Sequence, residues 1–112
     1  MGKPSRDKGA LFERHLVHLL QDAGMAAERV PLSGAAGGSF AGDISVPFLG
    51  QDHRFEAKIR ADGFKEIYRW LDKHKGLFLR ADRRDALVVL RMADFSELVM
   101  IAEGRRVKGE AA

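Results

Sequence analysis

The spacing of the hydrophobic residues changes at Gly24, and this change constrains the fold more than any other feature of the chain. Before Gly24, apolar residues recur at helical intervals, which predicts a helix over roughly residues 8–23 that Ser5 or Asp7 caps and Gly24 ends. After Gly24, they come in short runs separated by turn residues, which is typical of strands. The apolar face of the helix consists of Phe12, Leu16, Leu19, Leu20 and Ala23.

Three strands are expected in the middle of the chain, over residues 27–32, 42–48 and 54–60. The segment 33–39 between the first two is too rich in glycine, alanine and serine for a regular element, so we expect a mobile loop there. Residues 49–52 supply turn residues between the second and third strands. These two strands are therefore predicted to form an antiparallel hairpin.

The next part of the chain predicts a helix followed by two strands. Asp62 can cap this helix, which ends at Gly76. The strands are expected over residues 77–80 and 86–92, joined by the charged turn 81–85. The apolar stripe of the helix consists of Phe64, Ile67, Tyr68 and Leu71.

A last short helix is expected to start at Asp94, which has Glu97 three residues further on. From residue 104 to residue 112 we expect a flexible basic tail. The predicted order is α-β-β-β-α-β-β-α, an α/β (α+β) arrangement in which helices flank one mixed sheet. The apolar face of the last helix consists of Phe95, Leu98, Val99 and Ala102.

Length and composition limit the kind of protein. A chain of 112 residues can bury one core, so residues 1–112 are expected to form a single domain. Apolar runs of the ~20 residues needed to cross a bilayer are absent, and the first residues do not follow the pattern of a signal peptide, so we expect a cytoplasmic protein. Because the chain has no cysteine, a bound metal would need oxygen or imidazole ligands, which favours hard cations.

The charge balance gives a mild indication of a polyanionic partner. The chain has 19 Lys and Arg against 16 Asp and Glu, a formal net charge of +3. If three acids bind a metal, 13 acids remain on the rest of the molecule. Ordinary solvated surfaces also carry such charge runs, so charge alone does not distinguish a nucleic-acid-binding surface from an ordinary solvated one.

The motif with most chemical content lies in the predicted hairpin. Asp43 stands in its first strand, and Glu56 follows thirteen residues later in the second, with Lys58 two residues beyond. Because side chains alternate along a strand, Glu56 and Lys58 share one face. If the register brings Asp43 opposite them, two carboxylates converge as Mg²⁺ requires. The alternative is an ordinary salt pair between Glu56 and Lys58.

Glu13 offers a third carboxylate from the first helix. It continues the stripe that faces the sheet, where a charge needs a partner because an isolated buried charge is unfavourable. The alternative is a first-turn acid that the helix dipole favours. The choice between the two roles depends on the other acids.

Other possible sites are less specific. The four histidines lack metal-ligand spacing, and the glycine-rich segment lacks the Lys-Ser/Thr of a P-loop. Tyr68 and Trp70 could stack on bases, although Tyr68 lies on the apolar stripe and is predicted to belong to the core.

Taken together, these motifs resemble the Holliday junction resolvase branch of the PD-(D/E)xK nucleases, which includes archaeal-type and phage enzymes. The resemblance covers about half of the chain and weakens in the second half. It implies a restriction-endonuclease-like fold, in which helices flank a mixed sheet. The matching segments are residues 8–14, 30–34, 38–40, 42–44 and 55–58.

The resemblance implies that Glu13, Asp43 and Glu56 bind Mg²⁺ or Mn²⁺ and that Lys58 assists hydrolysis. It also implies that Ser39 or its neighbours approach the scissile strand. The expected function is that of a metal-dependent endodeoxyribonuclease that resolves Holliday junctions in DNA recombination and repair. Four basic residues are expected to grip the DNA backbone without reading bases: Arg6, Lys8, Arg60 and Lys65.

The substrate and the assembly follow from the same expectation. A symmetric four-way junction has two equivalent cleavage points, so a homodimer is the natural assembly. One alternative is a nuclease of the same fold that acts on duplex or other branched DNA. A second alternative is a DNA-binding module that performs no chemistry.

Overall fold

The computed structural model describes residues 3–30 and 42–104, with side chains over 7–30 and 43–104. Within these residues the order of elements is the predicted α-β-β-β-α-β-β-α, which confirms the mixed α and β class. The elements are α1 (Lys3–Asp22), β1 (Glu28–Arg29), β2 (Gly42–Phe48), β3 (Gln51–Ala57), α2 (Lys65–Leu71), β4 (Gly76–Leu79), β5 (Leu87–Leu90) and α3 (Met92–Ala102).

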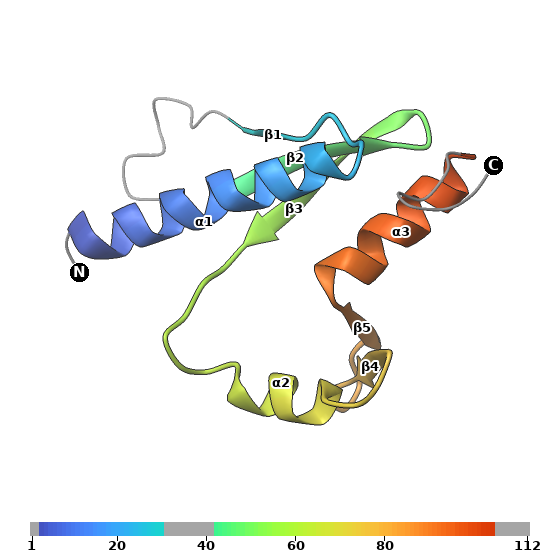
Figure 1. Cartoon of the computed structure of the whole chain (residues 1–112). Helices are drawn as coiled ribbons and strands as arrows, with labels where there is room; N and C mark the ends of the chain where they lie inside the picture. Colours follow the sequence, from blue (N-terminus) through green and yellow to red (C-terminus); the bar gives the residue numbers. More distant parts are fainter. Residues whose placement is uncertain (1–2, 31–41, 105–112) are drawn as a thin grey trace.

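The described strands form two antiparallel sheets, β1-β2-β3 and β4-β5, where the sequence suggests one mixed sheet. The cause lies after β3. Figure 1 shows that the chain leaves this strand in an extended stretch and reaches α2, β4 and β5 at a distance from the first sheet. The hairpin of β4 and β5 therefore pairs only with itself among the residues described.

Helix α1 starts earlier than predicted and ends where predicted. It begins at Lys3, so Ser5 and Asp7 lie inside the helix and the prediction that one of them caps it is wrong. At the other end, Gly24 has φ +107°, and its N–H donates to the Gln21 carbonyl at 2.9 Å. The Met25 N–H donates to the Leu20 carbonyl at 2.9 Å. This pair of bonds is a Schellman motif, which needs a residue that tolerates positive φ.

Strands β2 and β3 form the predicted hairpin. The turn consists of Leu49 and Gly50, both with positive φ (53° and 80°), as in the type I′ turns that suit the twist of two strands. Strand β2 has its predicted bounds, whereas β3 covers residues 51–57 in place of the predicted 54–60. Lys58 therefore follows the strand directly.

The core lies on one face of the three-stranded sheet. Ile44 and Val46 of β2 are 2% and 1% exposed, and they pack with Leu20 of α1 and with Val99 and Met100 of α3. Two-residue spacing puts Ile44 and Val46 on the same face of β2. Both α1 and α3 thus cover the face that these two residues define.

Helices α2 and α3 begin at other residues than predicted. Helix α2 begins at Lys65 after Phe64, with no side-chain cap, so the prediction that Asp62 caps it is wrong. Helix α3 begins at Met92 after Arg91, two residues before Asp94. In both helices, contrary to the prediction, no side chain caps the first turn.

The prediction that the apolar stripes of the helices belong to the core is only partly confirmed. In α2, Leu71 is buried but Tyr68 is 73% exposed, so the prediction of a core tyrosine is wrong. In α3, Val99 is buried as predicted, whereas Leu98 is 54% exposed. A stripe shows which residues share a face, but burial needs another element against that face. None of the described helices is long and apolar enough to span a membrane.

Candidate active site

Asp43 and Glu56 occupy directly opposite positions in the β2–β3 hairpin. Residues paired in this way have Cβ atoms about 4.5–5.5 Å apart, on the same face of the sheet. Their side chains are 39% and 55% exposed. The register that the sequence analysis assumed is therefore present, and two carboxylates converge at the open end of the hairpin.

This carboxylate pair lies on the face of the sheet that the helices leave open. Ile44 points into the core, so its neighbour Asp43 points away from α1 and α3. The same alternation places Ser45 and Arg54, which are opposite one another, on the face of Asp43. Among the residues that the structure describes, neither α1 nor α3 covers this side of the pair.

A cation accompanies each of the two acids. The Lys58 Nζ lies 3.2 Å from Glu56 Oε2, and the Arg54 Nη1 lies 3.4 Å from Asp43 Oδ2. Exposed ion pairs of this kind are worth about 0–1 kcal/mol, so they can open at little cost. The site can therefore exchange these contacts for a divalent cation and a phosphate.

Glu13 is the buried charged residue of the described core, with 6% of its surface exposed. Its Oε1 accepts a hydrogen bond from Arg29 Nε at 2.9 Å and forms an ion pair with Arg29 Nη2 at 2.8 Å. The partner that a buried charge needs is thus an arginine of β1. Arg29 stands opposite Ile44, so both Glu13 and Arg29 lie on the helix-covered face.

Glu13 does not join the other two acids directly. It is connected to them through β1, since the N–H of Val30, next to Arg29, donates to the Asp43 carbonyl at 3.0 Å. Among residues 7–30 and 43–104, no group of three acidic or histidine side chains is close enough to hold a metal ion. Carboxylate oxygens are nevertheless the ligands that Mg²⁺ and Mn²⁺ prefer, so the donor chemistry of Asp43 and Glu56 fits such an ion.

The remaining predicted site residues are placed only in part. Ser39 and the side chain of Arg6 lie outside the described residues. Lys8 is exposed on α1, and Arg60 is exposed beyond β3, where its Nη1 donates to the Ile59 carbonyl. At the start of α2, the Lys65 Nζ lies 3.5 Å from Asp62 Oδ1.

Two basic residues of the site were not predicted from the sequence. Arg54 lies two residues before Glu56, so strand alternation would have placed it on the same face. Arg29 contacts Glu13 across sixteen positions of sequence, and no local pattern indicates that pairing. The first could have been found from the sequence, whereas the second depends on the packing of α1 against β1.

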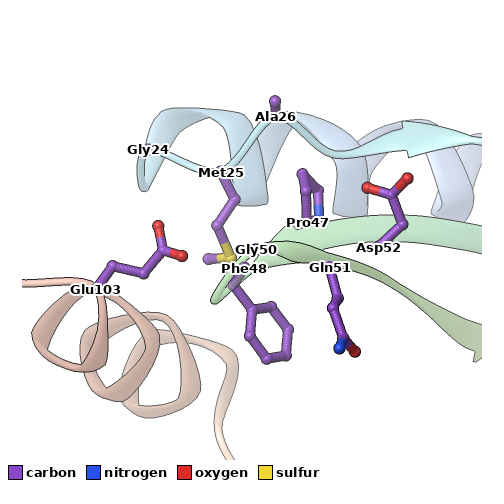
Figure 2. Close-up of a pocket in the computed structure, with 9 residues that line it drawn as sticks. All are labelled: Gly24, Met25, Ala26, Pro47, Phe48, Gly50, Gln51, Asp52 and Glu103. Carbon is purple, nitrogen blue, oxygen red and sulfur yellow. The ribbon is translucent and has the colours of Figure 1, made fainter.

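A pocket of 390 Å³ lies at the other end of the hairpin, near the Leu49–Gly50 turn (Figure 2). It is lined by two acids, Glu103 after α3 and Asp52 of β3, and Figure 2 shows them on opposite sides. Phe48 also lines this pocket. It lies at the opposite end of β2 from Asp43, about 17 Å away at the usual rise per residue. This pocket is therefore separate from the carboxylate pair.

Comparison with known proteins identifies a family whose model matches the chain. The model of a family described as archaeal Holliday junction resolvase (hjc) matches residues 4–103 of the chain. No curated protein and no solved structure matches it. The matched range contains α1 from its second residue onward, the hairpin of Asp43 and Glu56, and the elements up to α3.

Proposed function

The chain belongs to the archaeal Holliday junction resolvase family, and on this basis we propose that residues 1–112 form one metal-dependent nuclease domain that cuts four-way DNA junctions. The observation that carries the proposal is the cross-strand pair of Asp43 and Glu56 with Lys58 beside it. An acid pair next to an amine, on an open sheet face, is suited to phosphodiester hydrolysis. The proposed setting is recombination and repair of DNA in the cytoplasm.

Asp43 and Glu56 are the proposed ligands of Mg²⁺ or Mn²⁺. Such an ion, when bound, lowers the pKa of a water and offsets charge on the phosphate oxygens. Lys58, whose Nζ lies 3.2 Å from Glu56 Oε2, is proposed to orient the attacking water or to stabilise the negative charge that builds up on the phosphate. Glu13 is proposed as a third acid of the site. Its carboxylate pairs with Arg29 on the helix-covered face, so it would have to leave both this ion pair and that face to reach an ion held by Asp43 and Glu56.

The proposed DNA contacts surround this site. Lys8, Arg60 and Lys65 are exposed, and they would hold the phosphate backbone together with Arg6. Ser39 is proposed to approach the scissile strand. Contacts of this type make binding weaken as the salt concentration rises.

A homodimer is the proposed assembly, since a symmetric junction offers two equivalent cleavage points. The β4–β5 hairpin supports it, because both strands are apolar throughout, as in strands that are buried on both faces. Phe78 and Val88, which are opposite one another on one face, are 84% and 58% exposed. The radius of gyration is 15.9 Å, against about 13 Å for a compact chain of 100 residues. A second copy that packs on this hairpin would bury its open face.

A cleavage assay tests the proposed function. Labelled four-way junctions and linear duplexes are incubated with the wild-type protein in Mg²⁺, beside Asp43→Asn and Lys58→Ala variants. We expect junction cleavage to fall by about 100-fold or more in both variants. Asp52→Asn is the matched control, because Asp52 lies on the same strand face at the turn end of the hairpin.

The outcomes separate the candidate functions. Equal cutting of junction and duplex would favour a general nuclease, and equal activity of wild type and variants would remove these residues from the mechanism. A non-catalytic DNA-binding module is the alternative of a different class, since Asp43 and Glu56 also form ordinary ion pairs. Such a module would cut no DNA and would show no heat of Mn²⁺ binding in calorimetric titration.

A further inference from the structure

A second hollow opens directly beside Lys58. This cavity of 390 Å³ lies between α1, the segment after β3, and the start of α2. Lys58 belongs both to its wall and to the ion pair with Glu56. Phe12, which precedes Glu13, also lines this cavity. The cavity therefore adjoins the carboxylate pair, and a ligand inside it would lie next to a phosphate bound there.

The wall of this cavity is aromatic and apolar. Phe12, Ile59 and Phe64 are half-buried and line it, and Tyr68 of α2 stands at its side. Tyr68 is 73% exposed, so most of this residue is open to solvent. An exposed aromatic ring beside an apolar hollow offers a stacking surface for a flat ring.

The charged residues of the cavity are mainly cations. Lys58, Arg60 and Lys65 contribute positive charge, and Asp62 contributes the negative charge. Asp62 Oδ1 lies 3.5 Å from Lys65 Nζ, and Lys58 pairs with Glu56, so these charges offset one another and Arg60 leaves a positive excess. The ligand that suits this set combines a flat aromatic group with a phosphate, as a nucleotide does.

We propose that this cavity receives the base of an unpaired DNA nucleotide next to the scissile phosphate. The proposal rests on the nuclease function proposed above and names the feature of the substrate that the site selects. A base inside a paired duplex is stacked between its neighbours, and extracting it requires unpairing, which is least unfavourable where the base is already unpaired. Tyr68 would thus favour DNA with an unpaired nucleotide over a continuous duplex.

Binding can be measured separately from cleavage. The probe is a DNA duplex with one unpaired 2-aminopurine, and the reference is the same duplex with that base paired. Both are titrated with the full chain in EDTA, so that the result does not depend on metal or on hydrolysis. Stacking on Tyr68 is expected to quench the unpaired probe. Free deoxyadenosine monophosphate, as competitor, tests whether a nucleotide outside DNA binds equally well.

Variants of Tyr68 provide the decisive comparison. We expect Tyr68→Ala to weaken binding of the unpaired probe by about 5- to 100-fold and to leave duplex affinity unchanged. Tyr68→Phe is expected to keep the wild-type affinity, because stacking needs the ring and not the hydroxyl. Trp70→Ala is the matched control: Trp70 is a half-exposed aromatic residue of the same helix that does not line the cavity.

Three outcomes would overturn the proposal. These are an unchanged affinity in Tyr68→Ala, an equal loss for the unpaired and the paired probe, and binding of the free nucleotide as tight as that of the probe. The nuclease function is tested independently. If the wild type cuts no DNA but discriminates the unpaired probe through Tyr68, the nuclease proposal fails and the base site stands. If it cuts junctions without this discrimination, the base site alone fails.

Discussion

Asp43 and Glu56 face each other across the β2–β3 hairpin, and each carboxylate is held by a different cation, Arg54 and Lys58. Like charges directly opposite one another destabilise a sheet, so the hairpin tolerates this pair only with compensation. The two exposed ion pairs provide part of this compensation, and a divalent cation bound between the carboxylates would provide more of it. Stability and metal binding are therefore expected to be coupled at this position.

Thermal unfolding tests this coupling. Mn²⁺ is expected to raise the melting temperature of the wild-type protein, because an ion that binds only the folded state stabilises it by mass action. In Asp43→Asn the rise is expected to disappear, while stability without metal changes by about 1 kcal/mol or less. Asp52→Asn is expected to keep the wild-type rise, and a rise retained in Asp43→Asn would argue against metal binding at this pair.

The ion pair of the buried Glu13 with the partly exposed Arg29 predicts a larger effect on stability. Arg29→Met leaves a carboxylate that is 6% exposed without its partner, and we expect a loss of about 1–3 kcal/mol in the free energy of unfolding. Adding Glu13→Gln is expected to recover part of that loss, since the buried charge is then gone. Urea unfolding of both variants measures this, and Arg54→Met, at an exposed pair, provides the control with a loss below about 1 kcal/mol.

The β4–β5 hairpin predicts the location of the dimer surface. Phe78→Glu places a charge on the apolar face that Phe78 and Val88 share, and a charge there would be buried by a second copy. We expect this variant to sediment as a monomer at concentrations where the wild type is a dimer. Leu11→Glu alters an exposed leucine of α1 and is expected to leave the dimer intact. A wild-type protein that is monomeric throughout would exclude this interface.

The hairpin turn predicts a stabilising substitution. Leu49 has φ +53°, a left-handed conformation that is unfavourable for leucine and is adopted more readily by asparagine. The type I′ turn also favours asparagine before glycine, as at Gly50. Leu49→Asn is expected to raise the free energy of unfolding by about 0.5–1 kcal/mol, measured by urea denaturation. A loss of stability would show that the leucine side chain contributes packing that outweighs the strain.

Lys75 predicts a dependence of stability on alkaline pH. Its Nζ lies 2.8 Å from Asp94 Oδ1, and the hydrogen bond and charge of Asp94 raise the pKa of Lys75 above its ordinary value of 10.5. The stability that this contact contributes is present below pH 10.5 and is lost as the pH rises through the raised pKa. In Lys75→Gln, this part of the alkaline decline in melting temperature is expected to be absent.

The local parts of the fold were accessible from the sequence. The end of α1 before Gly24, the bounds of β2 and the hairpin of β2 with β3 follow from residue spacing and turn chemistry, whereas the facing positions of Asp43 and Glu56 were assumed. These patterns depend on neighbours along the chain, and the hairpin joins its two strands by two residues. Chain proximity is why the carboxylate pair could be proposed, on an assumed register, without knowledge of the remaining fold.

The long-range parts were not accessible. The ion pair of Glu13 with Arg29 depends on how α1 packs against β1, and the exposure of Tyr68 depends on what α2 leaves uncovered. The separation of β4 and β5 from the first sheet likewise depends on the course of the chain after β3. None of these relationships leaves a periodic signal in the sequence.

The alternation of side chains along β3 also restricts changes in the number of residues between the turn and Glu56. One added residue between the turn and Glu56 would rotate Glu56 and the following lysine toward the side of Ile44, where charge is unfavourable. Two added residues would return both to the open side. Length variation in this hairpin is therefore expected in even steps, and odd steps would abolish the acidic pair while leaving every residue of it in the sequence.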